Sequence, residues 1–270
     1  MRWKVWNSIW IVFCLVSCQP KTAEVQTVDL NNWQFQYQGE WHSAEVPGNN
    51  FSDLLNHGFI PDPFYGTNED SVQWVAENEW VYRTTFSSDE AKNQTLIFKG
   101  LDTYAEIFLN DSLILKTDNM FRTYELEVSQ LLEETNSLQI HFLPPHIEEE
   151  AKIKDLGYKL PGGSRVFTRK AGFHYGWDWG PIIKPAGIWR PVELQSWDVC
   201  KLTDIHISQD NIKDSIAHLT IGIEIESSCE KMISITTTIL DKTCKDFKLK
   251  KGTNRLNMLV NIPNPKRWWP

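Results

Sequence analysis

From Trp80 onward, the chain alternates apolar and polar side chains with a period of two. Between Trp80 and Phe86, every second position carries Trp, Tyr, Thr or Phe. Such a period places successive side chains on opposite faces of a strand, whereas a helix repeats about every 3.6 residues. Further segments with strand character are 95–100, 105–109, 113–115, 124–128, 138–142 and 188–195. Seven or more short strands of this kind predict an all-β fold, a sandwich or jelly roll. The Asn110-Asp111 pair between two of these segments predicts a hairpin turn.

Two stretches depart from this pattern. The segment from Phe51 to Gly58 predicts a short helix that begins at Ser52 or Asp53 and ends at Gly58. The segment 144–185 shows little alternation and carries glycine at 162, 163, 172, 176 and 180. Because loops of this length are uncommon in compact domains and often carry function, we expect a functional loop there.

After Trp197 the alternation becomes cleaner, as in the isoleucines of segment 219–225. About five strands are expected in the seventy residues of 201–270, whereas an immunoglobulin-like sandwich takes about 100 residues and seven strands. We therefore predict a jelly-roll domain over 30–200, followed by an incomplete immunoglobulin-like sandwich over 201–270. We also expect the natural protein to continue beyond Pro270.

The N-terminus has the features of a secretion signal. Two basic residues precede an apolar run from Ile9 to Val16, which is shorter than the ~20 residues that span a bilayer. The Ser17-Cys18 pair that follows resembles the lipobox of bacterial lipoproteins. We predict a signal peptide over 1–17, a lipidated Cys18, and a tether over 18–29 that holds the protein at a bacterial envelope membrane, in the periplasm or at the outer membrane. The alternative is a plain signal peptide with an incidental cysteine.

The amino-acid composition limits the classes of molecule that the protein is expected to bind. Lys and Arg number 27 against 35 Asp and Glu, which gives a net charge of −8, and no Lys/Arg-rich run is present. We therefore expect no nucleic-acid partner. The 13 tryptophans offer flat apolar faces for stacking, while their indole N–H groups still donate hydrogen bonds, and this combination suits sugars. The three cysteines after the signal region, Cys200, Cys229 and Cys244, form no CxxC pair, which argues against a structural zinc site. We predict no metal or cofactor, and the disulfide state of the three cysteines stays open.

An ordered set of motifs carries a family resemblance. The motifs are 46–48 (VPG), 60–66 (IPDPFYG), 68–69 (NE), 73–75 (QWV), 80–83 (WVYR), 100–103 (GLDT), 119–122 (NMFR), 169–171 (RKA), 176–181 (GWDWGP), 187–191 (GIWRP) and 264–270 (NPKRWWP). Their order and spacing resemble the N-terminal region of β-mannosidases of glycoside hydrolase family 2.

The resemblance implies a jelly-roll sugar-binding domain, an immunoglobulin-like domain, and then a (β/α)₈ barrel that holds two catalytic glutamates. Retaining hydrolysis needs both carboxylates about 5 to 5.5 Å apart, and the family keeps both in the barrel. The chain therefore resembles the non-catalytic part of an exo-acting β-mannosidase, inactive alone, whose partner is a glycan or oligosaccharide ending in β-D-mannose. No residue of this chain is predicted to be catalytic.

Two Asn-Glu pairs look deceptively catalytic, because the family's acid/base glutamate follows an asparagine. The pairs end in Glu69 and Glu79. Their surroundings match the family's N-terminal motifs rather than its barrel. We expect both glutamates to make hydrogen bonds in loops.

Asp178 is the predicted substrate-binding residue, together with Trp177. Trp177 and Trp179 flank this carboxylate, and Gly176 and Gly180 free the backbone around it. An ionised carboxylate accepts hydrogen bonds from two sugar hydroxyls at once. By resemblance, Asp178 contacts the nonreducing-end sugar and Trp177 lines its pocket. The alternative is a turn aspartate between two core tryptophans.

Four other polar residues near these motifs carry expectations. Arg169 and Lys170 either pair with Asp178 or remain solvated. Asp102 is expected to be a turn residue, and His174 a loop histidine with satisfied hydrogen bonds.

Two other functions remain open. One is a free-standing carbohydrate-binding envelope lipoprotein without hydrolase activity. The other is a different family 2 specificity, such as a β-galactosidase or an exo-glucosaminidase. The sequence leaves the oligomeric state and the aglycone preference open.

Overall fold

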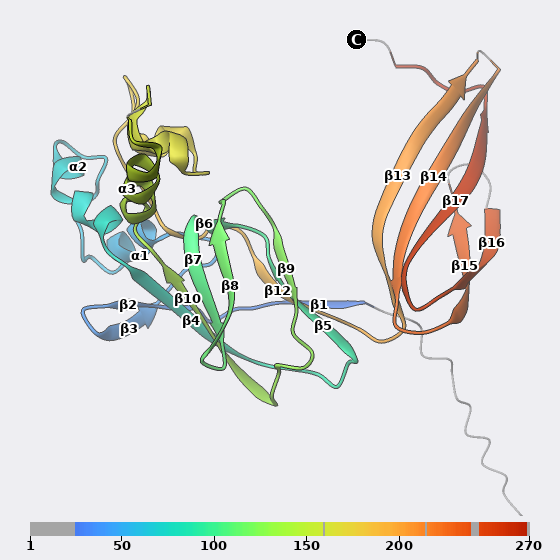
Figure 1. Ribbon diagram of the computed structural model, residues 1–270, viewed down its shortest axis with the longest axis horizontal. Helices are drawn as coiled ribbons and strands as arrows, with labels where there is room; N and C mark the ends of the chain where they lie inside the picture. The colour runs from blue at the N-terminus through green and yellow to red at the C-terminus, as the bar shows by residue number, and fades with distance from the viewer. Residues whose placement is uncertain (1–24, 159, 214, 239–242, 269–270) are drawn as a thin grey trace, which may run out of the picture.

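The computed structural model describes residues 25–158, 160–213, 215–238 and 243–268. The chain forms two β bodies in succession, the first containing β1 to β12 and the second β13 to β17 (Figure 1). The predicted signal peptide and Cys18 lie outside the described residues. Within the described part of the chain, no helix has the length and apolar character needed to cross a membrane.

The first body is a sandwich of antiparallel sheets, so the all-β prediction is confirmed. One sheet has the order β1 (Gln26–Asp29), β12 (Val192–Trp197), β5 (Asn93–Phe98), β9 (Tyr124–Glu127). The other has the order β3 (Glu40–Ser43), β2 (Gln34–Tyr37), β4 (Trp80–Ser87), β10 (Thr135–Phe142), β7 (Tyr104–Leu109), β8 (Ser112–Asp118). A short pair, β6 (Leu101–Asp102) and β11 (Gly187–Ile188), lies beside them.

The two-residue period decides which side chains form the core. In β10, Leu138, Ile140 and Phe142 are fully buried, while the residues between them stay partly exposed. On the neighbouring β4, Tyr82 is fully buried opposite Ile140. One face of each strand therefore lies between the sheets, where apolar burial contributes about 25 cal/mol per Å².

The Asn110-Asp111 hairpin is confirmed between β7 and β8. Leu109 pairs with Ser112, and both turn residues have positive φ angles, 48° and 63°. Such angles are those of the tight turn whose twist matches the flanking strands.

The helices lie at one end of the first sandwich (Figure 1). They are α1 (Asn50–Asn56), α2 (Asn68–Ser71), η1 (Gln73–Glu77), α3 (Pro145–Leu156), η2 (Gly163–Phe167) and η3 (Gly172–Tyr175). The helix predicted near Phe51 is confirmed, but its N-cap is Asn49, whose Oδ1 accepts from the amides of Phe51 and Ser52.

Two sequence predictions of local structure were wrong. The segment expected to be an extended loop contains α3, with Pro145 in its first turn and Gly157 at φ 79° after its last residue. The predicted tether reaches too far, because Gln26–Asp29 forms strand β1 and pairs with β12.

The second body has the five strands that the sequence predicted. They form a sheet of β13 (Cys200–Ile212), β14 (Ile216–Ser227) and β17 (Gly252–Pro263), and a pair of β15 (Lys231–Thr237) and β16 (Thr243–Leu249). Ile221 and Ile223 of β14 are buried, whereas their partners Ile207 and Ile205 on β13 are each 54% exposed. The apolar face of this sheet is therefore covered over β14 and open over β13.

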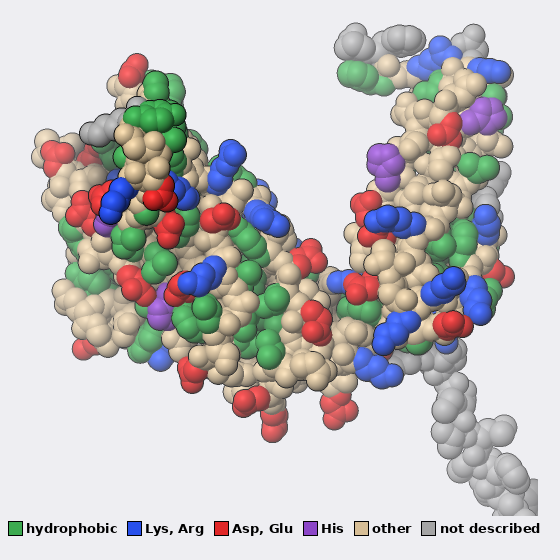
Figure 2. All heavy atoms as spheres, in the orientation of Figure 1, with side chains coloured by type: hydrophobic (Ala, Val, Ile, Leu, Met, Phe, Trp, Pro, Cys, Tyr) green, Lys and Arg blue, Asp and Glu red, His purple; other side chains and the backbone are tan. Residues whose placement is uncertain are grey.

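The connection between the two bodies is short. Strand β12 ends at Trp197 and β13 begins at Cys200. The Ser228 hydroxyl donates to the carbonyl of Asp198 at 2.7 Å, and the Ser228 amide donates to that of Val199 at 2.9 Å. On the face drawn in Figure 2, acidic and basic side chains are interspersed over both bodies.

Candidate functional site

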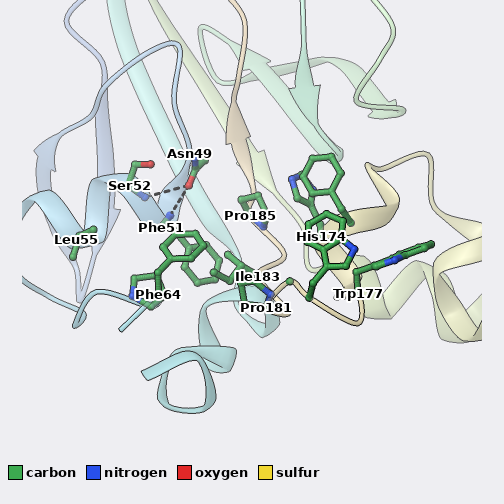
Figure 3. Close-up of a pocket in the computed structure, with 14 residues that line it drawn as sticks. Asn49, Phe51, Ser52, Leu55, Phe64, His174, Trp177, Pro181, Ile183 and Pro185 are labelled. Atoms are coloured by element: carbon green, nitrogen blue, oxygen red, sulfur yellow. Dashed lines mark hydrogen bonds between the residues drawn. The ribbon is translucent and has the colours of Figure 1, made fainter. Parts of the chain in front are cut away.

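A hollow of about 510 Å³ opens at the end of the first sandwich where the helices lie. Its walls come from α1, from the loop around Phe64 and from the segment 173–185 (Figure 3). The lining residues are mainly apolar or aromatic: Asn49, Phe51, Ser52, Leu55, Pro63, Phe64, Phe173, His174, Trp177, Trp179, Gly180, Pro181, Ile183 and Pro185. Such walls suit a ligand with apolar faces that stack on aromatic rings.

A tight turn beside this pocket carries the predicted substrate-binding residues. Trp177 and Gly180 exchange two backbone hydrogen bonds of 3.2 Å, which places Asp178 and Trp179 at the tip. Asp178 is exposed, and its carboxylate makes no hydrogen bond or ion pair with another residue that the structure describes. Trp177 lines the pocket, whereas Asp178 lies outside its wall.

The alternative for Asp178 was a turn aspartate between two core tryptophans. It is correct for the turn and wrong for the tryptophans. Asp178 does lie in a turn, but Trp177 is 55% and Trp179 83% exposed. Two indoles and a carboxylate are therefore exposed to solvent together. Packing within this chain does not offset the free energy lost by exposing the apolar indole rings. The sugar-binding role of Asp178 and Trp177 stays a prediction.

The expectations for Lys170 and Asp102 were wrong. The side chain of Lys170 has no exposed surface, and its Nζ lies 2.6 Å from Oδ2 of Asp102. Lys170 also donates to the carbonyl of Pro185. Burial lowers the pKa of Lys170, while the charge of Asp102 opposes this change. Because 68 positions of sequence separate the two partners, no local pattern could have revealed the pair.

His174 lies in the pocket wall next to this ion pair, and its expected satisfied state was wrong. Its Nδ1 is buried with no hydrogen-bond partner among the described residues, 3.8 Å from Oδ2 of Asp102. Burial, helped by the charge of Lys170, lowers the pKa of His174 to about 4. The imidazole is therefore neutral at pH 7.

Glu149 of α3 is a buried acid that the sequence did not single out. It is 3% exposed and accepts hydrogen bonds from Thr168 Oγ1 at 2.8 Å and from the Tyr175 hydroxyl at 2.5 Å. Burial, followed by the contact with Glu149, raises the pKa of Tyr175. This network joins α3 to the segment that leads into the turn.

Both glutamates of the Asn-Glu pairs make hydrogen bonds, as expected, but only Glu79 lies in a loop, because Glu69 lies in α2. Glu69 accepts from the amide of Ile182 at 2.6 Å. Glu79 contacts Nδ1 of His141 at 2.9 Å. Arg169, the neighbour of Lys170, pairs through its backbone with Asn119.

The described residues contain no group of three or more His, Cys, Asp or Glu side chains placed to hold a metal ion. Cys200, Cys229 and Cys244 are all free thiols. What the site offers is thus stacking surface, an exposed carboxylate, and a neutral imidazole in the pocket wall.

The chain was compared with known families and proteins. Residues 33–190 match the model of the glycosyl hydrolase 2 galactose-binding domain-like family. The chain belongs to this family. The match covers nearly all of the first sandwich, including the pocket and the Trp177–Gly180 turn.

The similar proteins include β-mannosidases, the family that the sequence motifs resemble. Beta-mannosidase B of Thermothelomyces thermophilus is 39% identical over 189 residues, 65% of this chain and 22% of that protein. Beta-mannosidase B of Emericella nidulans is 31% identical over 271 residues, 92% of this chain and 32% of that protein. The chain therefore spans between about a fifth and a third of these relatives.

Solved structures extend the likeness over both bodies. The beta-D-mannosidase of Dictyoglomus thermophilum superposes with a TM-score of 0.82 at 35% identity, over 92% of this chain and 32% of that one. The exo-chitosanase of Amycolatopsis orientalis has a TM-score of 0.68 at 18% identity, which shows a shared fold alone. The chain thus corresponds to the N-terminal part of a family 2 glycoside hydrolase.

Proposed function

We propose that this chain is the N-terminal, non-catalytic part of an exo-acting β-mannosidase that releases terminal β-D-mannose with retention. In this proposal Asp178 and Trp177 recognise the nonreducing-end sugar, and the catalytic glutamates belong to the part of the polypeptide that this chain does not include. The observation that carries the proposal is the tip of the Trp177–Gly180 turn. There the carboxylate of Asp178, which has no partner among the described residues, is exposed between two exposed indoles. The mannosidase names of the relatives support the choice of sugar.

The chemistry of the turn suits this role. An ionised carboxylate takes two hydroxyl donors at once, and charged hydrogen bonds stabilise a complex by about 1.5 to 3 kcal/mol each. The turn is closed by its own backbone bonds, so the carboxylate is presented on a pre-formed support. Neighbouring indole faces supply stacking for the apolar side of a pyranose.

The test replaces Asp178 by Asn in the polypeptide expressed from the complete gene. We expect kcat/KM on an aryl β-mannoside to fall by about 100-fold, because two charged hydrogen bonds weaken in the transition state. The matched control is Asp111→Asn, since Asp111 is also exposed in a two-residue turn, on the β7–β8 hairpin. Equal kinetics of the Asp178→Asn variant and the wild-type enzyme would remove Asp178 from the site.

The isolated chain tests the second half of the proposal. We expect purified 21–270 to hydrolyse no aryl β-mannoside, because retaining hydrolysis needs two carboxylates that we assign to the barrel. Turnover above that of a mock preparation would contradict the assignment. Nucleotide sequencing past the codon for Pro270 gives an independent check, since a stop codon there would favour a carbohydrate-binding protein without hydrolase activity.

We also propose that Cys18 is lipidated and anchors the protein to a bacterial envelope membrane. The support is the basic, apolar and Ser17-Cys18 pattern of the N-terminus. Cys18→Ser is expected to move the protein from the membrane fraction to the soluble fraction, with Cys14→Ser as the control. Membrane retention of the Cys18→Ser variant would exclude this anchor.

A further inference from the structure

The segment 171–186 carries the Trp177–Gly180 turn, here called the recognition turn. Its ends are held by apolar packing, since Ala171 is buried and Ile183 and Ala186 pack against the core of the first sandwich. The side chains nearer the turn are open. Phe173 is 63%, Trp179 83% and Ile182 43% exposed. Side chains this open contribute little of the free energy that fixes a loop. Polar attachments to the rest of the sandwich therefore act together with the packing of the two ends in deciding where the turn lies.

The base of the segment has one such attachment. The buried ammonium of Lys170 pairs with Asp102 of β6 and also donates to the carbonyl of Pro185. A single buried charge thus holds both ends of the segment between 170 and 185. The turn at 177–180 lies in the middle, several residues from either end.

A second attachment lies close to the turn, at Ile182. The Ile182 amide donates to Oε1 of Glu69 at 2.6 Å, and the Ile182 carbonyl accepts from Nε2 of Gln73 at 2.8 Å. The same Nε2 also donates to the backbone carbonyl of Glu69 at 2.9 Å. Both polar groups of one residue are therefore held by two side chains that lie more than 100 positions earlier in the sequence.

Ile182 in turn packs against Gly176, the residue just before the turn. A Cβ built on Gly176 would lie 2.6 Å from Cγ1 of Ile182, and Gly176 has a φ of 86°. The close approach and the left-handed backbone both require glycine at 176. Only Pro181 lies between Ile182 and the closing Gly180 on the other side. Ile182 is thus linked to both ends of the turn. It packs against Gly176 before the turn, and it follows Gly180 by two residues in the chain.

We propose that Glu69 and Gln73 are positioning residues, which hold the Ile182 backbone and through it fix the turn that presents Trp177 and Asp178. Neither side chain touches the ligand in this arrangement. The Asn-Glu motif at 68–69 then acts in recognition of the sugar, at a distance, and not in catalysis. This effect on recognition rests on the proposed function, whereas the position of the turn is a property of the chain itself.

The first experiment measures the turn directly, by amide hydrogen exchange of residues 176–184 in the whole 270-residue chain. Glu69→Ala removes the acceptor, and we expect these amides to exchange about tenfold faster, the effect of losing one hydrogen bond to a charged group. Glu69→Gln keeps an acceptor oxygen and is expected to restore most of the protection. Asp70→Ala is the matched control, since Asp70 is an exposed acid in the same helix turn.

Because Glu69 is only partly buried, we expect all three variants to fold, and thermal unfolding of each verifies this. Gln73→Ala gives a second measurement if Glu69→Ala alters the fold. Unchanged exchange at 176–184 in Glu69→Ala, or failure of Glu69→Gln to restore protection in a folded chain, would overturn the positioning role.

The second experiment separates this inference from the proposed function. The same variants are assayed for aryl β-mannoside hydrolysis in the polypeptide used to test Asp178. Faster exchange together with a several-fold rise in KM for Glu69→Ala, reversed in Glu69→Gln, supports both the positioning role and the assignment of the turn to sugar recognition. Faster exchange with unchanged kinetics supports the positioning role and contradicts the assignment of the turn to sugar recognition.

Discussion

The histidine in the pocket wall gives the protein a pH dependence of stability that can be calculated. The pKa of His174 is lowered from 6.5 to about 4 in the folded chain, first by burial and then by the charge of Lys170. The unfolded chain therefore binds a proton at His174 between pH 6.5 and 4, where the folded chain does not. Because the unfolded state binds more protons in this window, stability falls as the pH is lowered through it.

The size of the effect follows from the shift. One pKa unit corresponds to about 1.36 kcal/mol. Between pH 7 and pH 4.5, linkage with pKa values of 6.5 and about 4 gives a loss of roughly 2.4 kcal/mol. The ring retains 15% exposure, and solvent screening reduces the effect, so we expect about 1 to 2 kcal/mol.

The assay compares wild-type chain with His174→Gln by urea denaturation at both pH values. Many other groups titrate over this range, and the comparison cancels them because both chains contain them. We expect the stability of the variant relative to wild type to increase by about 1 to 2 kcal/mol on acidification. A difference that is the same at pH 7 and pH 4.5, or an NMR titration of the His174 ring with a midpoint above pH 6, would refute the reasoning.

Three further substitutions test the fold. Tyr82→Phe removes the hydroxyl that donates to Oδ2 of buried Asp53 at 2.7 Å, and urea denaturation is expected to show a loss of about 1.5 to 3 kcal/mol. Gly187→Ala places a Cβ 2.7 Å from the Cα of Asn49, so we expect a loss of about 1 to 3 kcal/mol in the same assay, and wild-type stability would contradict that contact. Ile205→Ser combined with Ile207→Ser is expected to lower the binding of a hydrophobic dye with little effect on the free energy of unfolding, because both side chains are half exposed. A large loss of stability would show that these two isoleucines are part of the core.

The sequence predicted the strands well, because their pattern depends on local burial. Alternation near Tyr82 and Ile140 identified β4 and β10, and the Asn110-Asp111 pair identified a turn that requires positive φ angles. Helix α3 was missed because its apolar residues do not form one stripe. Its Pro145 and Gly157 were nevertheless the signals of a helix start and stop, and could have found it.

The candidate site was predictable only where its residues are adjacent in sequence. The motif around Asp178 contained the turn and its exposed side chains. The buried pair of Lys170 with Asp102, and the contact of Glu69 with Ile182, join residues that are far apart along the chain. Such pairs are fixed by the fold as a whole. The sequence therefore offered a pairing of Lys170 with Asp178 or a solvated charge, but not the pair with Asp102.

The short connection between the two bodies affects where the recognition turn lies relative to the second body. Asp198 and Val199 link β12 to β13, and Ser228 donates hydrogen bonds to the carbonyls of both. Lys201 of β13 also donates to Oε1 of Gln195 on β12 at 3.4 Å. Helices α1, α2 and α3 lie at the end of the first sandwich that faces away from the second body (Figure 1). The pocket beside the turn is lined in part by α1. The position of Asp178 relative to the second body therefore depends on a short connection with few hydrogen bonds across it. Ser228→Ala would remove the hydroxyl that donates to the carbonyl of Asp198 and leave every residue that lines the pocket unchanged.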